Sequence, residues 1–262
     1  MAQLIWHAMC IFNFIRRLKL RMPEYSSNDI LLQNRRILVI SPHADDETFG
    51  CAGTIAKAKS LGSEVYLMYV SVGDLVHFST EHRDVAGNVR AAEIDAATKT
   101  MGVDGYTILY NDAHLHMRID SLPRRDLISQ IERESDLSIE KVKPDILMIP
   151  AISFNQDHEA IFYAAYAACR PHLHSDKHFV NLVMTYDQPQ LAWNHTPFHP
   201  NLYVDISDFL ATKLRAHACH HSQLRPDPHH GSLENIERLA RLRGSEVSVS
   251  AAEAFQCQRI VL

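Results

Sequence analysis

Three acids and a histidine crowd into five residues near the start of the chain, in the segment His43-Ala44-Asp45-Asp46-Glu47. Carboxylates this close together repel one another unless a cation compensates their charge. Histidine nitrogen and carboxylate oxygen are ordinary zinc ligands, and residues three apart on a tight turn can converge on one ion. The segment therefore predicts a metal site that uses His43 and Asp46.

A second polar segment, residues 155–158 (NQDH), supplies the third ligand of this prediction. A catalytic zinc ion takes three protein ligands and keeps one position for water, and His158 is the best placed candidate. Asp45 is then free to take a proton from that water. The alternative is that the acids of the first segment only charge the first turn of a helix, where the helix dipole favours them.

Strands and helices alternate along the chain around these two segments. Apolar runs predict strands at residues 36–41, 64–71, 106–110, 145–150, 179–186 and 202–206. Apolar residues at helical spacing predict helices at 53–61, 89–101, 122–142, 158–169 and 209–221. This alternation indicates an α/β fold with a Rossmann-like, mostly parallel sheet and helices on both faces. Both polar segments then follow strand ends, where open α/β sheets bind their ligands.

Composition narrows the class of protein. The 262 residues are 46% hydrophobic and 22% charged, which is ordinary for a globular chain. The net charge of −5 argues against a nucleic-acid partner. The five cysteines include no CxxC pair, which is typical of a protein in a reducing compartment, so we expect a cytoplasmic location.

The first 21 residues have apolar side chains at helical spacing, followed by a basic cluster from Arg16 to Arg21. A secretory signal carries its charges before the apolar core, so this order argues against export. We expect an N-terminal amphipathic helix and connector over residues 1–30, and the α/β domain over 31–262. Two interpretations of residues 1–21 stay open. The helix packs on the domain or in a homo-oligomer interface, or it lies peripherally on the inner face of the membrane.

The segment Ser41–Glu47 (SPHADDE) resembles the PHPDDE signature of the PIG-L/LmbE-like zinc-dependent de-N-acetylases. Five further motifs follow in the order of that family, within about residues 35–257: Ala52–Ile55, Val72–Asp74, Arg90–Gly102, Asp157-His158 and Lys213–Gln223. The resemblance implies that residues 31–262 form a deacetylase domain. It also implies removal of an N-acetyl group from an N-acetylhexosamine-containing substrate, either a small molecule or a lipid-linked amino sugar.

The resemblance also implies roles for the two polar segments. His43, Asp46 and His158 would hold one Zn²⁺ per chain, or another divalent metal, and Asp45 would be the general base. Asp157 would act in catalysis by orienting neighbouring groups. The alternative for Asp157 is capping of the helix that follows it.

The same resemblance implies that three further residues bind the substrate: Arg90, Asn155 and Tyr186. The alternatives are an Arg90–Glu93 pair on one helix and a core position for Tyr186 at a strand end. Asn155 stands where many members of the family carry a histidine. Since an amide cannot deliver a proton at neutral pH, we expect Asp45 both to take the proton from water and to return it to the leaving nitrogen.

Ala44 replaces a proline of the family signature, which removes no chemical group. Glu47 is expected to serve the loop or the helix start, and His220 to have a packing or surface role. The other histidines of the polar segments are predicted to be surface residues: His114, His116, His195, His199, His229 and His230. Two other functions stay open on this scaffold. One is a metal-dependent amidase acting on a non-acetyl or non-sugar amide, and the other is a catalytically silent binding protein.

Overall fold

The computed structural model describes residues 29–76 and 84–262. The predicted amphipathic helix at residues 1–21 lies outside the described residues, so its packing and membrane interpretations both stay predictions. None of the helices that the structure describes is long and apolar enough to cross a membrane.

A seven-stranded sheet with the strand order β5-β2-β1-β6-β7-β9-β8 forms the centre of the molecule. Its parallel strands are β5 (Gly105–Asn111), β2 (Glu64–Val72), β1 (Arg36–Ser41), β6 (Ile146–Pro150) and β7 (Leu182–Tyr186). β9 (Ala252–Ile260) runs antiparallel to β7 and to the edge strand β8 (Leu202–Asp205). A short hairpin, β3 (Leu75–Val76) with β4 (Asp84–Val85), lies apart from the sheet. The predicted mostly parallel α/β fold is confirmed.

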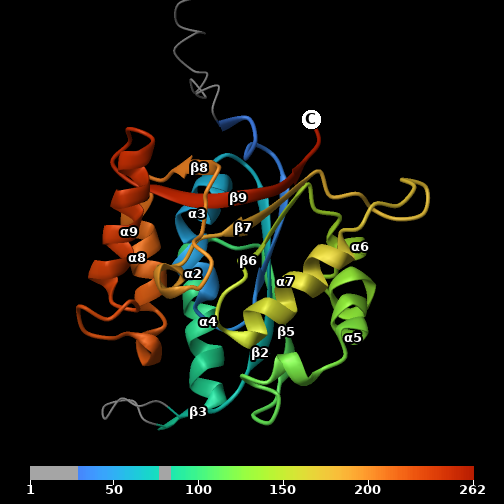
Figure 1. The fold of residues 1–262 in the computed structure, drawn as a ribbon, viewed down its shortest axis with the longest axis horizontal. Coiled ribbons are helices and arrows are strands. Elements are labelled where there is room, and N and C mark those ends of the chain that lie inside the picture. The colour runs from blue at the N-terminus through green and yellow to red at the C-terminus, as the bar shows by residue number, and fades with distance from the viewer. Residues whose placement is uncertain (1–28, 77–83) are drawn as a thin grey trace, which may run out of the picture.

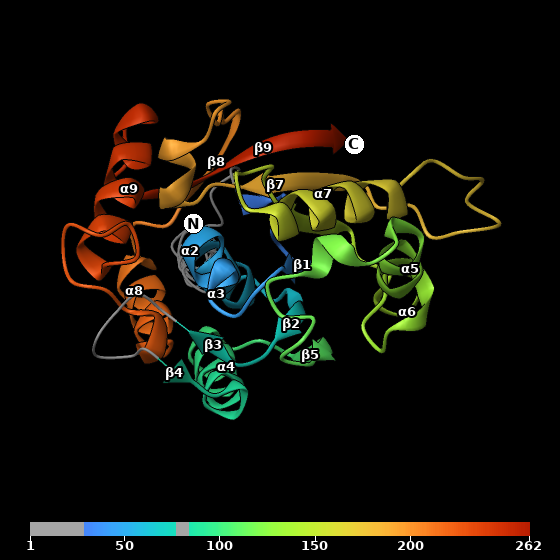
Figure 2. The same cartoon turned by 60° about the horizontal axis from the view of Figure 1, so that its bottom comes forward.

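Helices cover both faces of the sheet (Figures 1 and 2). One layer contains α3 (Ala52–Ser60), α4 (Gly87–Met101), α8 (Leu210–Ala218) and α9 (Leu233–Glu246), with the short α2 (Asp46–Gly50) at a strand end. The other layer contains α5 (Arg124–Ser129), α6 (Ile139–Val142) and α7 (Gln156–Ala168). Successive residues of β1 serve alternate layers. Ile37 and Val39 pack on the first, and Leu38 and Ile40 on the second.

The single helix predicted at 122–142 is wrong. After α5, a π-helical turn at Gln130–Glu134 leads to an extended Ser135, and α6 begins only at Ile139. The intervening residues are Ser-Asp-Leu-Ser, and Ser and Asp favour turns and caps because their side chains compete for backbone hydrogen bonds.

β9 and α9 were not predicted. In β9, alanine and glutamine interrupt the apolar pattern.

A buried ion pair links β9 to the helices packed against it. The Glu253 carboxylate accepts hydrogen bonds from the backbone N–H groups of Gly53 and Thr54, at 2.9 and 2.7 Å, at the start of α3. It also contacts Lys213 Nζ of α8 at 2.6 Å, and Lys213 donates in turn to the carbonyls of Thr48 and Phe49. Glu253 therefore ties β9, α3 and α8 together beneath α2.

We expect Glu253→Ala to lower the free energy of unfolding by about 3–5 kcal/mol, since it leaves the Lys213 ammonium buried without its counter-ion. Urea denaturation followed by circular dichroism measures this loss. Glu246→Ala is the control, because its surface pair with Arg243 should contribute no more than about 1 kcal/mol. Equal losses in the two variants would contradict the structural role of Glu253.

Candidate metal centre and active site

The predicted metal ligands gather at the carboxyl ends of β1 and β6, which are parallel neighbours in the sheet. His43 comes from the turn between β1 and α2, Asp46 is the first residue of α2, and His158 comes from the first turn of α7. The turn is short because α2 begins at Asp46, directly after the strand-end segment. Parallel pairing thus places two segments that are more than a hundred residues apart in the chain at one edge of the sheet.

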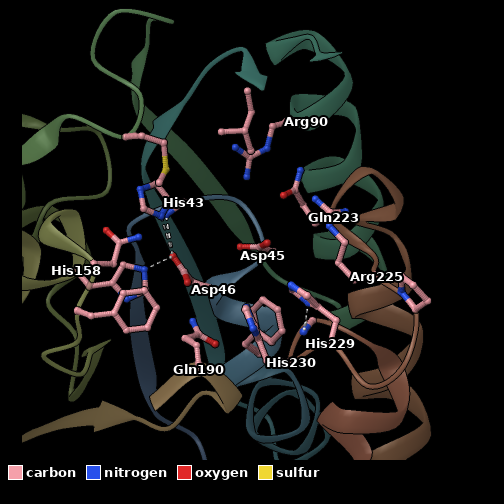
Figure 3. Close-up of a pocket in the computed structure, with 17 residues that line it drawn as sticks. His43, Asp45, Asp46, Arg90, His158, Gln190, Gln223, Arg225, His229 and His230 are labelled. Atoms are coloured by element: carbon pink, nitrogen blue, oxygen red, sulfur yellow. Dashed lines mark hydrogen bonds and ion pairs between the residues drawn. The ribbon is translucent and has the colours of Figure 1, made fainter. Parts of the chain in front are cut away.

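Two imidazole nitrogens face the same carboxylate oxygen in this cluster. His43 Nδ1 lies 3.5 Å and His158 Nε2 lies 3.2 Å from Asp46 Oδ2 (Figure 3). All three side chains are buried, and their ligand atoms lie within 4.8 Å of one another. Two nitrogens and one oxygen converging in this way fit a divalent cation, and this is a donor set that zinc uses.

Neighbouring side chains hold the cluster in place. Asp157 Oδ2 lies 2.9 Å from His43 Nε2, while its other oxygen accepts from the backbone N–H of Ile119 at 2.9 Å. Gln188 Nε2 donates to Asp46 Oδ1 at 2.8 Å, which leaves Oδ2 for the histidines. Gln188 was not predicted, since no pattern in the loop after β7 distinguishes it from other polar residues.

The carboxylates also control the charge of the cluster. Burial alone would lower the pKa of His43, but hydrogen bonds to Asp157 and Asp46 raise it to about 9. For Asp46, burial alone would raise the pKa. The charges and hydrogen bonds of His158 and His43 instead hold this pKa well below its usual range. A metal ion must therefore displace a proton from His43 when it binds.

Asp45 has a left-handed backbone conformation, with φ of 112°. Such a conformation is costly for a residue with a Cβ and persists only where the surroundings impose it. Glu47 helps to impose it, because its Oε2 accepts from Ser41 Oγ and from the Asp45 N–H, both at 3.1 Å. His220 Nε2 contacts the other Glu47 oxygen at 2.9 Å. Glu47 thus serves the turn, as expected, and His220 is a buried partner of Glu47.

The Asp45 carboxylate points into the pocket, beside Asp46 and toward Arg225 (Figure 3). Burial raises its pKa to about 7, and the Asp46 carboxylate adds to this rise, while the charges of Arg90 and His220 oppose it. A bound cation would lower this pKa again. The carboxylate thus lies in the pocket, next to the candidate metal ligands.

Arg90 of α4 is buried and also lines the pocket. Its Nη2 donates to the Ala44 carbonyl at 2.8 Å, and its Nη1 lies 2.6 Å from His116 Nε2. The alternative pairing with Glu93 is wrong, since Glu93 accepts instead from the N–H and hydroxyl of Ser222. Arg90 therefore fixes the turn at Ala44, where the family signature has proline.

The prediction that His116 is a surface residue is wrong. Burial and the adjacent charge of Arg90 lower its pKa to about 3, so the neutral ring can accept from Arg90. Its Nδ1 lies 3.1 Å from Ser71 Oγ at the end of β2. The polar segment around His116 folds over the strand end, which its composition alone does not indicate.

Asn155 lines the pocket and also caps α7, since its Oδ1 accepts from the Asp157 N–H at 3.0 Å. The alternative role of Asp157 as the helix cap is therefore wrong. Because the cap uses the amide oxygen, the amide NH₂ is the group that Asn155 can offer to a ligand.

The prediction that Tyr186 lies in the substrate site is wrong. Its side chain is fully buried and does not line the pocket, and its hydroxyl donates to the Ile40 carbonyl at 3.0 Å. The ring packs against Gly50 so closely that a Cβ there would lie 2.4 Å from the ring. α2 covers the end of β7, so the alternative of a core tyrosine is correct.

The pocket has a volume of about 760 Å³ and a second, polar wall opposite His43, Asp46 and His158 (Figure 3). This wall comes from the segment between α8 and α9 and contains Gln223, Arg225, His229 and His230. His229 and His230 were expected on the surface, and both are exposed, but they also line this pocket. A long polar connection with no regular pattern offered no signal for this placement.

Comparisons with known proteins find deacetylases among the relatives of this chain. The chain is 29% identical over 86 residues to a 1D-myo-inositol 2-acetamido-2-deoxy-alpha-D-glucopyranoside deacetylase from Mycobacteroides abscessus, which covers 30% of this chain and 31% of that protein. The aligned part thus spans about a third of the length of that relative. This chain is also 26% identical over 229 residues to a diacetylchitobiose deacetylase from Thermococcus kodakarensis, covering 78% of this chain and 76% of the other.

Solved structures share the fold. The N,N'-diacetylchitobiose deacetylase from Pyrococcus horikoshii matches with a TM-score of 0.64 and 22% identity, covering 94% of this chain and 92% of the other. The 4-carboxy-2-hydroxymuconate hydratase GalB from Pseudomonas putida KT2440 matches with a TM-score of 0.68 and 17% identity, covering 86% and 97%. The fold alone therefore does not fix the reaction. The sequence model of the GlcNAc-PI de-N-acetylase family, PIG-L, matches residues 38–169, which is half of the chain, and the protein belongs to this family.

Proposed function

We propose that this protein is a zinc-dependent hydrolase that removes the acetyl group from an N-acetylhexosamine unit. The observation that carries the proposal is the convergence of His43, Asp46 and His158 at one wall of a pocket, with the Asp45 carboxylate beside them. Family membership and the amino-sugar substrates named for the relatives support the choice of an acetamide as the bond that is cleaved.

The donor set favours Zn²⁺, because imidazole nitrogens suit zinc better than they suit Mg²⁺ or Ca²⁺. A cation bound there would supply Lewis-acid chemistry, polarising the acetamide carbonyl and making a nearby water more acidic. The protein's own contribution is to orient the ligands. Asp157 fixes the ring of His43, and Gln188 fixes the carboxylate of Asp46.

Asp45 performs the proton transfers in this mechanism. Its carboxylate takes a proton from the attacking water, and the oxygen of that water forms a bond to the acetyl carbon. The NH₂ group of Asn155 donates a hydrogen bond as negative charge develops on the carbonyl oxygen. Asp45 then returns the proton to the nitrogen, the C–N bond breaks, and acetate and the free amine leave. One residue performs both transfers because Asn155 cannot deliver a proton.

The general-base role predicts that Asp45→Asn keeps the metal and the fold but loses at least about a hundredfold in kcat, the lower end of what general-base catalysis contributes. Acetate release from N-acetylglucosamine, measured alongside metal content, tests this. A loss of less than about tenfold would exclude Asp45 as the base. If no metal-containing preparation of the native protein releases acetate, the proposed function itself is contradicted.

The metal centre predicts that His158→Ala and Asp46→Ala purify without stoichiometric zinc and release no acetate, since each leaves two protein ligands. Elemental analysis by mass spectrometry gives the metal-to-protein ratio. His229→Ala is the matched control, because this histidine lines the same pocket outside the cluster and should leave full occupancy. Full occupancy in His158→Ala would show that another residue is the third ligand.

The supporting role of Asp157 predicts a graded effect. Asp157→Asn should weaken zinc binding by about 10- to 100-fold without abolishing it, because it removes the charge that orients His43. Competition with a chromogenic chelator measures the dissociation constant. Unchanged affinity in a folded Asp157→Asn protein would reduce Asp157 to a packing residue.

A further inference from the structure

The two oxygens of the Asp46 carboxylate face different partners. Oδ2 accepts from the His43 backbone N–H at 3.0 Å and lies 3.2 Å from His158 Nε2, on the side where the two imidazoles converge. Oδ1 accepts instead from Gln188 Nε2 at 2.8 Å, and the same NH₂ group donates to the Asp46 carbonyl at 3.3 Å. A cation that shares Oδ2 with the imidazoles therefore meets one carboxylate oxygen, because the Gln188 amide occupies the other.

The orientation of the Gln188 amide follows from hydrogen-bonding chemistry. A carboxylate can only accept, so Gln188 turns its NH₂ group toward Asp46 and its oxygen away. That oxygen accepts from Gln190 Nε2 at 2.8 Å. If the amide were turned the other way, its oxygen would face Asp46 Oδ1, and two acceptors repel each other. Gln190, which lines the pocket near Asp46 (Figure 3), thus holds the donor end of Gln188 on the carboxylate.

The backbone at Gln188 is fixed as well. Its N–H donates to Asp187 Oδ1 at 2.9 Å, and Asp187 Oδ2 accepts from Arg243 Nε of α9 at 2.7 Å. The Asp187 N–H donates to the Ala254 carbonyl of β9 at 3.1 Å. The Gln188 side chain is buried on this fixed backbone, so its amide keeps one position against Asp46. Such outer partners orient the groups that bind a metal ion.

A ligand that offers one oxygen bears on which cation the centre prefers. Two imidazoles and one carboxylate oxygen suit Zn²⁺, which is commonly four-coordinate and keeps a position for water. Mn²⁺ prefers a higher coordination number with more oxygen ligands, and a carboxylate that binds through both oxygens supplies one more. The hydrogen bond from Gln188 to Asp46 Oδ1 opposes that second mode.

We propose that Gln188, oriented by Gln190, is a positioning residue that holds Asp46 as a one-oxygen ligand and so makes the centre prefer Zn²⁺ to Mn²⁺. The inference rests on the metal centre of the proposed function. It concerns cation binding alone, so its test does not depend on the reaction.

The test measures two dissociation constants in the full-length protein and its variants: that of Zn²⁺ by chelator competition, and that of Mn²⁺ by electron paramagnetic resonance of the free ion. We expect Gln188→Met to weaken Zn²⁺ binding by about 10- to 100-fold, because it removes the bond that orients a ligand. Mn²⁺ binding should change by less than about threefold, because the freed Oδ1 offers a further oxygen. Gln190→Met should shift the ratio of the two constants in the same direction by about two- to tenfold, the contribution of one neutral hydrogen bond.

Substitution with Co²⁺ reports the coordination number directly. The visible absorption of Co²⁺ is strong in a four-coordinate site and weakens when further ligands bind. We expect Gln188→Met to weaken the absorption per bound Co²⁺, because Asp46 then binds through both oxygens. A purely structural role of Gln188 would leave this absorption unchanged and would contradict the proposal.

Gln223→Met is the matched control. Gln223 is also a glutamine that lines this pocket, but its amide donates to Ser222 Oγ at 2.8 Å in the opposite wall. The control should leave both dissociation constants and the Co²⁺ absorption as they are in the native protein.

Equal weakening of Zn²⁺ and Mn²⁺ binding in Gln188→Met would overturn the proposal. Circular dichroism checks that each variant is folded. If Gln188→Met does not fold, Gln190→Met decides, because Gln188 is the one hydrogen-bond partner of the Gln190 amide among the residues that the structure describes. An unchanged ratio in Gln190→Met would then overturn the proposal. A shifted ratio in a protein that releases no acetate would contradict the proposed reaction and leave the role of Gln188 standing, whereas a native protein that binds neither ion would overturn both.

Discussion

Four carboxylates lie together at the strand ends, and the rest of the site depends on how their charge is compensated. Asp157 faces His43, Asp46 faces both His43 and His158, and Glu47 faces His220. Buried carboxylates persist as ions only with such partners. Asp45 differs, since its carboxylate forms no hydrogen bond with another side chain in the part of the chain that the structure describes. It is therefore the one acid of the four left free for proton exchange.

The carboxylates and their partners compensate one another only if both are held rigidly in position, and the surrounding fold holds them. Glu47 and Arg90 fix the turn after β1 from two sides, so that Asp45 keeps its left-handed backbone conformation. Beneath the turn, the ion pair of Glu253 with Lys213 joins three elements from distant parts of the chain. Strain in the turn is thus balanced by contacts that form only when β9 and α8 are in place.

Two pockets meet at the loop that follows β6. The first lies between the candidate metal ligands and the wall that contains Arg225, while the second is lined by apolar side chains as well as by Thr185, Gln256 and Gln258. The loop of residues 151–155 separates them and carries both Phe154 and Asn155. Variation in this loop can therefore change the space beside the candidate metal ligands while the ligands themselves stay the same.

The sequence by itself determined the elements and the candidate ligands that local patterns encode. Continuous apolar runs located the parallel strands. The closely spaced acids after β1 pointed to His43, Asp46 and Asp45, because these chemically active side chains lie within four consecutive residues. Only the tertiary structure decided which distant side chains complete the site. Gln188, His116 and Arg225 reach it from loops without periodicity, and Tyr186 is kept out because α2 covers its strand end. Such contacts depend on how the loops fold over the sheet, and no local spacing records that packing.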